Sequence, residues 1–238
     1  MTHHDANSPP CDHFRVSESG ARRETRIVLR PVANPLPLAF LALAIATTAF
    51  ASIQLGWISQ AQGHIVALGI LALSVPMQLL AAVVGFLARD PIAATGIGIV
   101  SGTWGAMCLG TLASAPGAPA QGLGVILVAS AVCLLVPGVA AYAKAIPALV
   151  IGSSAVRFAV TGIAEIGGGL GWMRAAGWVG LALGALSFYA AVALEFEAST
   201  GSSILPLGRL GPAAQTLNNE LDDQIRNIAK EPGVRQQL

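Results

Sequence analysis

The feature that most constrains this chain is the near absence of charge over its middle part. Between residues 31 and 194 only six side chains are charged: Arg89, Asp90, Lys144, Arg157, Glu165 and Arg174. The whole sequence of 238 residues is 54% hydrophobic and 11% charged, whereas a typical soluble domain is about 25% charged. Because so few charges cannot cover a surface in water, we predict that lipid surrounds this part of the chain.

Six apolar runs have the length of a membrane-spanning helix, which needs about 20 residues. The predicted spans are residues 36–57, 65–87, 92–113, 123–143, 146–166 and 175–196. The loops between them are short, and Pro91 suits the first turn of the third helix. We therefore expect an all-α integral membrane protein whose residues 31–208 form one bundle of six transmembrane helices.

Basic residues in the short loops predict how the helices are oriented, because cytoplasmic loops carry an excess of Lys and Arg. One side of the membrane would hold Arg22, Arg23, Arg26, Arg30, Arg89, Lys144 and Arg209. The other side would hold only Arg174. We expect both termini in the cytoplasm and a multi-pass protein of the inner (plasma) membrane. Three tryptophans would then lie at the outer interface as aromatic anchors: Trp57, Trp172 and Trp178.

The two ends of the chain are polar. Residues 1–30 contain five arginines and no signal-peptide core, so we expect a disordered cytoplasmic tail. Its His3, His4, Asp12 and His13 could bind a metal, but nothing fixes their geometry, and we expect a solvated tail with neither metal nor cofactor. Residues 209–238 would form a second cytoplasmic tail with a short amphipathic helix. That helix would pack on the membrane face or on another subunit, or remain solvated and marginal.

The start of the first span is marked by ANPLPLAF, residues 33–40. A helix leaves its first amide N–H groups without intrahelical partners, and in lipid each of them is costly. Pro35 and Pro37 have no N–H, and the Asn34 side chain can accept a hydrogen bond from another amide. The segment predicts either a plain capped helix end or an end whose dipole attracts a carboxylate.

Two pairs of glycines have the GxxxG spacing that lets membrane helices approach closely. They are Gly98 with Gly102 and Gly180 with Gly184. We expect one pair to pack within the chain and the other to contact a neighbouring subunit, and the sequence does not assign them.

Arg157 is the charge nearest the middle of a span, where it costs roughly 2.5–3.5 kcal/mol on insertion scales. Glu165 lies eight residues further on, about 80° around the helix and about 12 Å along it, so the two are not direct neighbours. Two interpretations remain open. Arg157 attracts a substrate carboxylate, which a guanidinium binds through two parallel hydrogen bonds, or it pairs with backbone carbonyls or extends toward an interface.

Four segments resemble, in order, conserved stretches of the acetate uptake transporter family, the YaaH-like succinate–acetate permeases. ANPLPLAFLALAIATT (33–48) is similar to the family's opening NPxPLGL signature, with Ala39 in place of a glycine. QLLAAVVGFLARDPIAATGIGIVSGTWGAM (78–107) resembles its second and third helices, and AGWVGLALGALSFYAA (176–191) the start of its sixth. GSSILPLG (201–208) is similar to its closing GxxxLPxG motif.

The resemblance implies a channel-like fold of six helices around a path in each subunit of a homohexamer. It also implies uptake of acetate or other small carboxylates together with a proton. Asn34, Thr47 and Gln78 are the best path-lining candidates, although each is also suited to an interhelical hydrogen bond. Leu43 and Val100 stand where relatives place aromatic residues, and Gly85 replaces a glutamate. These departures predict a wider path and an altered substrate.

Three classes of function are weighed against one another. The first is a membrane transporter or channel for acetate or other small carboxylates, acting by symport with a proton; Arg157 is added to its path candidates. The second is a non-transporting membrane sensor or scaffold of the same fold, acting through its C-terminal tail. An enzyme is not expected, because the spans contain no His/Asp/Glu cluster. The nearly neutral net charge of +1 gives no indication of nucleic-acid binding.

Overall fold

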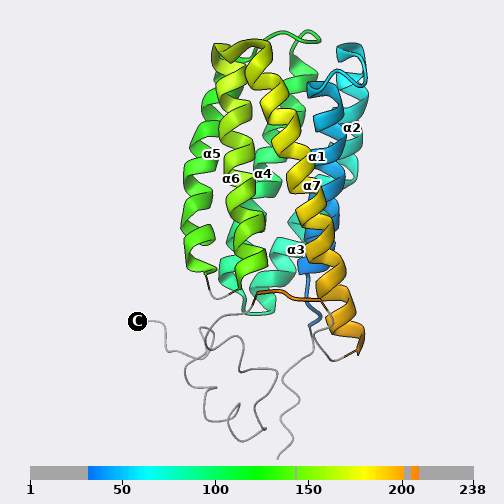
Figure 1. Cartoon of the computed structure of the whole chain (residues 1–238), viewed down its shortest axis with the longest axis vertical. Coiled ribbons are helices and arrows are strands. Elements are labelled where there is room, and N and C mark those ends of the chain that lie inside the picture. The colour runs from blue at the N-terminus through cyan, green and yellow to red at the C-terminus, as the bar shows by residue number, and fades with distance from the viewer. Residues whose placement is uncertain (1–31, 143, 201–204, 209–238) are drawn as a thin grey trace, which may run out of the picture. The chain divides into compact units, whose positions relative to one another are not determined.

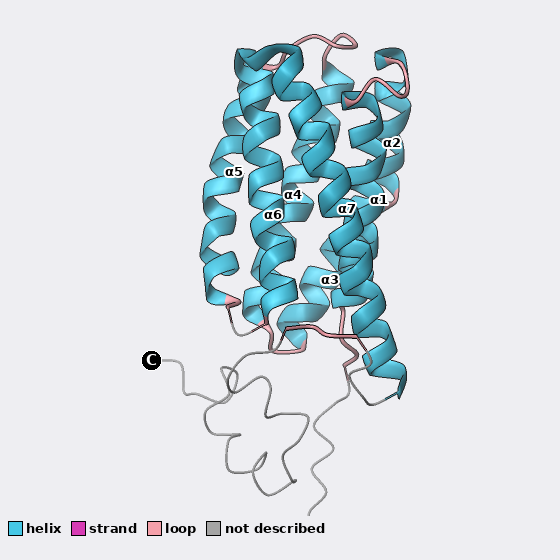
Figure 2. Ribbon diagram, in the orientation of Figure 1, coloured by secondary structure: helices cyan, strands magenta, loops and turns pink. Residues whose placement is uncertain are grey.

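The computed structural model describes residues 32–142, 144–200 and 205–208, and within these ranges the chain is mainly helical (Figures 1 and 2). The helices are α1 (Leu36–Gln54), η1 (Gln60–Gln62), α2 (Gly63–Ala72), α3 (Ser74–Leu87), α4 (Pro91–Ala113), α5 (Gln121–Ala140), α6 (Ala145–Ile163), η2 (Ala164–Gly168) and α7 (Gly169–Thr200). The two predicted tails, including the amphipathic helix expected in the second, lie outside the described residues.

Five helical stretches of the described chain are long and apolar enough to cross a membrane. The fifth runs from Ala145 to Thr200, and its 56 residues would extend about 84 Å as one straight helix, far more than a bilayer core of about 30 Å. The chain instead reverses within η2, where Gly167 has φ 143°. Its two arms, α6 and α7, lie side by side in the bundle (Figure 1).

The first five predicted spans agree with the observed helices to within three residues, except that the second is interrupted, and the sixth, predicted at 175–196, is the longer α7, Gly169–Thr200. Residues 65–87 contain α2 and α3, which meet at Leu73. Pro76 lacks the N–H that would bond to the carbonyl of Ala72, and this accounts for the interruption just before it.

The beginnings of two helices follow the sequence closely. At α1, the Leu36 N–H donates to Oδ1 of Asn34 over 3.1 Å, and Pro37 lies in the first turn. At α4, Pro91 is the first residue, and Oδ1 of Asp90 accepts from the Ala93 N–H over 3.2 Å. In both cases the proline and the side-chain oxygen reduce the number of unpaired N–H groups.

The beginning of α6 is completed by a distant part of the chain, residues 205–208. The N–H groups of Ala145 and Ile146 donate to the carbonyls of Gly208 and Leu207, over 3.0 and 3.3 Å. On α7, the hydroxyl of Tyr189 donates to the carbonyl of Pro206 over 2.9 Å. The segment that resembles a family's closing motif thus caps the helix whose own sequence has no N-terminal cap.

Glycines set the closest approaches between helices. In the Gly180–Gly184 pair both residues face α1, because a Cβ at Gly180 would lie 3.1 Å from Cβ of Ala51 and one at Gly184 would lie 2.5 Å from Oγ1 of Thr48. In the other pair, a Cβ at Gly102 would meet nothing within 4 Å. The Gly180–Gly184 pair is therefore the one that packs within the chain.

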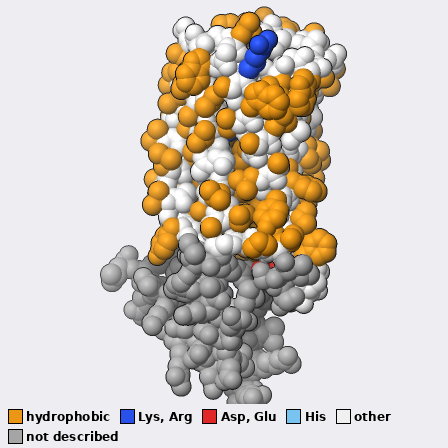
Figure 3. Space-filling model, in the orientation of Figure 1, with side chains coloured by type: hydrophobic (Ala, Val, Ile, Leu, Met, Phe, Trp, Pro, Cys, Tyr) orange, Lys and Arg blue, Asp and Glu red, His pale blue; other side chains and the backbone are white. Residues whose placement is uncertain are grey.

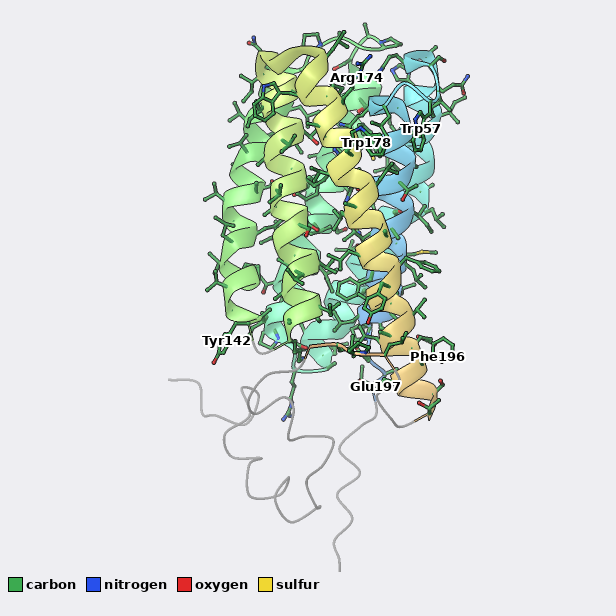
Figure 4. The ribbon with its side chains drawn as sticks, in the orientation of Figure 1. Trp57, Tyr142, Arg174, Trp178, Phe196 and Glu197 are labelled. Carbon is green, nitrogen blue, oxygen red and sulfur yellow. The ribbon has the colours of Figure 1, made fainter. Side chains whose placement is uncertain are left out.

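The outer surface matches a lipid environment. Many large hydrophobic side chains are exposed, and they are spread along the height of the bundle in view (Figure 3). Trp57 and Trp178 lie at one end near Arg174, and their rings make an edge-to-face contact of 6.5 Å (Figure 4). Tyr142 and Phe196 lie exposed at the opposite end (Figure 4). Aromatic residues at both ends are typical of the two membrane interfaces.

A test of the packing uses Gly162, where α5 and α6 come closest. A Cβ there would lie 2.8 Å from the carbonyl oxygen of Gly124 and 2.8 Å from Cγ2 of Val128. Because a backbone atom cannot rotate away, Gly162→Ala should lower the free energy of unfolding by about 1–3 kcal/mol. Thermal unfolding in detergent measures it. Gly102→Ala is the matched control and should unfold at or above the wild-type temperature; an equal loss in both variants would contradict this account.

Candidate functional site

A small cavity lies inside the bundle between α1, α3, α4 and α6. Its lining is almost entirely apolar, the exceptions being Gln78 and Ser154: Ala39, Phe40, Leu43, Gln78, Gly96, Ile97, Val100, Val150, Ile151 and Ser154. Its volume is about 10 Å³, and in this measure one water molecule needs about 10–15 Å³. The cavity, which is called the constriction below, is thus too small in this conformation for a carboxylic acid.

Three of the six residues predicted for the path line this cavity: Leu43, Gln78 and Val100. They come from three different helices and lie 57 residues apart at most, so only the tertiary structure brings them together. Gln78 is buried, and its Oε1 has no hydrogen-bond partner among the described residues. Its amide is the polar group on α3 that faces an otherwise apolar constriction.

Thr47 and Arg157, two further predicted residues, form a buried polar layer next to the cavity. The Arg157 side chain is 0% exposed. Its Nη1 donates to Oγ1 of Thr161 over 2.7 Å, and its Nε donates to Oγ1 of Thr47 over a longer 3.4 Å. The Thr47 hydroxyl in turn donates to the Gly180 carbonyl over 3.1 Å. The layer therefore joins α1, α6 and α7 through neutral partners.

The polar layer lies one helical turn from the constriction. On α1, Thr47 follows the cavity residue Leu43 by four residues, which is about 6 Å along the helix. On α6, Arg157 follows the cavity residue Ser154 by three residues. Both helices run toward the end that holds Trp57 and Arg174 (Figures 1 and 4). The guanidinium thus lies between the constriction and that end of the bundle.

Asn34, the sixth predicted residue, lies apart from the other five. It is exposed at the beginning of α1, where its side chain caps the helix. Its position is an end of the bundle rather than the constriction. Gly85, where relatives carry a glutamate, packs against α4, because a Cβ there would lie 3.0 Å from Cβ of Ala94.

Glu165 does not compensate the charge of Arg157. Its Oε2 accepts the Ala120 N–H over 2.9 Å, which ties the turn after α6 to the beginning of α5. Among the described residues the salt bridge is between Lys144 and Asp90, over 2.9 Å, and none involves Arg157. The sequence expectation that Arg157 and Glu165 are not direct neighbours is confirmed.

Sequence reasoning missed a cluster of three aromatic rings beside the polar layer. Trp104 is fully buried and makes edge-to-face contacts with Phe50, at 5.9 Å, and with Phe158, at 5.8 Å. Its Nε1 has no acceptor among the described residues. Helical spacing was the available signal, because Trp104 is one turn from Val100 on α4 and Phe158 directly follows Arg157.

This arrangement places a mostly apolar cavity beside a buried cation. The constriction is apolar with one free amide oxygen, and the layer beside it holds a positive charge whose protein partners are neutral hydroxyls. Uncharged molecules cross such a constriction at lower cost than ions, because desolvation of a charge is far more expensive. A guanidinium beside it favours an anionic or acidic visitor.

Comparison with known proteins gives a structural similarity. A scan of protein-family models found no match, and a search of curated proteins found none. The solved structure of the bacterial acetate channel SatP matches with a TM-score of 0.63 and 23% sequence identity, over 74% of this chain and 99% of that chain. The resemblance noted from the sequence is confirmed, and what the two chains are shown to share is the fold.

The hydrogen bond from Arg157 to Thr161 gives a prediction about stability. Thr161→Val keeps the shape of the side chain but leaves Nη1 of a buried cation without that acceptor. We expect the free energy of unfolding to fall by about 1–3 kcal/mol, measured by thermal unfolding in detergent. Thr95→Val, on an exposed face of α4, is the matched control and should have no such effect. An unchanged Thr161→Val variant would show that the bond contributes nothing to stability.

Proposed function

We propose that this chain is a transporter or channel for acetate or other small carboxylates, that it belongs to the acetate uptake transporter family, and that its transport is linked to a proton. One observation carries the proposal: a narrow, mostly apolar cavity at the centre of a fold that a bacterial acetate channel shares. The residues at the constriction and the charge beside it fit a small acid of mixed character.

The proposed assembly has six crossings, both termini in the cytoplasm and six copies of the chain in the inner membrane. The reversal at Gly167 supports six crossings, because it divides the 56-residue apolar stretch into two arms. The aromatic residues at both ends support two membrane interfaces. The orientation is supported by the distribution of Lys and Arg between the loops. The hexamer comes from the family resemblance.

In the proposed mechanism the acid crosses the constriction in its neutral form. An isolated carboxylate would lose its hydration there without an adequate replacement, whereas the protonated acid needs only a hydrogen bond or two. Oε1 of Gln78 can accept a hydrogen bond from the O–H of the neutral acid. Because the cavity of about 10 Å³ is too small for acetate, the side chains of Phe40 and Leu43 must rotate to let it pass. Proton and carboxylate then move together.

The test of function is uptake of radiolabelled acetate by liposomes that contain the purified protein. Liposomes without protein measure the leak of neutral acid through lipid. An external buffer that is more acidic than the liposome interior provides the proton gradient. Proton-linked uptake should be faster than this leak, increase with the gradient and be insensitive to a membrane potential set by K⁺ and valinomycin. Uptake that follows the potential would support an anion channel instead. If no carboxylate enters faster than through lipid alone, the proposal is wrong.

A prediction for Leu43 tests whether the cavity is the path. Leu43→Ala should widen the constriction and raise the ratio of butyrate to acetate uptake roughly tenfold, since one methylene in a fitted apolar site is worth about 1–3 kcal/mol. Rates are compared per folded protein, because a buried Leu→Ala change also lowers stability. Leu41→Ala, which truncates a side chain that is 40% exposed on the same helix, should leave the ratio unchanged. An unaltered ratio in Leu43→Ala would remove this cavity from the path.

A further inference from the structure

Within the described ranges of the chain, the charge of Arg157 is not paired with a carboxylate. Its side chain is fully buried in α6, and none of the described carboxylates forms a salt bridge with it. Glu165 is held by the Ala120 N–H, and Asp90 is paired with Lys144. A buried charge without a partner is strongly unfavourable, more so than most losses of packing.

The hydrogen-bonding capacity of the guanidinium is only partly used. It has five N–H donors, and its partners are the two hydroxyls of Thr47 and Thr161. The Nη2 atom has no partner among the described residues although it is buried. Nη1 carries two N–H groups. One donates to Thr161, and the other has no partner among the described residues. Together these groups are the fork that binds two oxygens of a planar anion.

The neighbouring helix provides room for this side chain. A Cβ at Gly180 of α7 would lie 2.9 Å from Nε and 3.1 Å from Cζ of Arg157, so any other residue there would collide with the guanidinium. The Gly180 carbonyl also accepts a hydrogen bond from the Thr47 hydroxyl. This bond orients the Thr47 oxygen so that it can accept from Nε of Arg157. Residues of three helices, α1, α6 and α7, therefore position the guanidinium.

We propose that Arg157, held by Thr47, Thr161 and Gly180, is a binding site for the carboxylate of a small acid. This deepens the proposed function: the site lies one helical turn from the constriction and would hold the acid as an anion before it takes up a proton and passes Gln78. The charge attracts and concentrates the anion, and the constriction admits the neutral form. Arg157 would then supply selectivity for acids rather than the route itself.

A monocarboxylate fits this site better than other anions. The free groups form one fork, which matches two oxygens in a plane, whereas phosphate offers more oxygens than the layer has donors for. A halide ion is a single atom, so it cannot accept the two parallel hydrogen bonds of the fork through two separate oxygens.

The site is tested by direct binding of acetate to purified protein in detergent, followed through the acetate methyl signal in saturation-transfer NMR. We expect Arg157→Gln to weaken binding roughly ten- to a hundredfold, as for loss of a charge-assisted bond pair. Arg157→Lys keeps the charge but not the fork, and it should also bind at least several-fold more weakly. Arg174→Gln removes an exposed arginine from the end of the bundle nearest the site and should bind acetate like the wild type.

Each outcome decides the proposal. Equal acetate affinity in wild type and Arg157→Gln overturns it, and so does chloride that competes with acetate at equal concentration. If Arg157→Gln does not fold, judged by gel filtration, Arg157→Lys decides, and an unchanged affinity in that variant overturns the site. Liposome uptake separates this inference from the proposed function. If the wild type binds acetate but does not transport it, the binding site stands and the proposed function is wrong. If the protein transports acetate but Arg157→Gln does not weaken binding, the proposed function stands and the binding site is wrong.

Discussion

The absence of water around the apolar stretch is the constraint on which the rest of the structure depends, because every polar group in lipid must find its partner inside the chain. The helix ends illustrate it. Asn34 and Asp90 cap the beginnings of α1 and α4, Glu165 holds the beginning of α5, and residues 205–208 complete the beginning of α6. These contacts close the ends of the bundle with groups drawn from loops and from the distant end of the chain.

The same constraint makes the interior informative. A packed membrane bundle has no reason to bury a guanidinium or an amide without a partner, yet Arg157 and Gln78 both have buried atoms with no partner in the described part of the chain. They lie in successive layers, one turn apart, on helices that surround a narrow cavity. The proposed path for small acids would account for both, because a passing molecule would supply the missing partners and the apolar constriction would restrict which form of it passes.

Much of this could be predicted before any coordinates, although unevenly. The spans and the caps at Asn34 and Asp90 follow from hydropathy and from local rules about proline and amide groups. Leu43, Gln78 and Val100 were selected through a family resemblance and lie together at the cavity. Trp104 was missed although its helical spacing from Val100 was an available signal, and the contact between Gly124 and Gly162 was missed because it has no local signature. The Gly124–Gly162 contact joins two helices through single glycines, outside any GxxxG spacing.

The sequence alone indicated a lipid environment and the approximate bounds of the apolar stretches, because hydropathy and backbone hydrogen bonding act locally along the chain. It also showed that Arg157 lies within a span. Only the tertiary structure decided what surrounds that charge. Whether a carboxylate lies near a guanidinium depends on how α1, α6 and α7 rotate against one another, and that rotation is set by side-chain packing at glycines such as Gly180, which no local pattern contains.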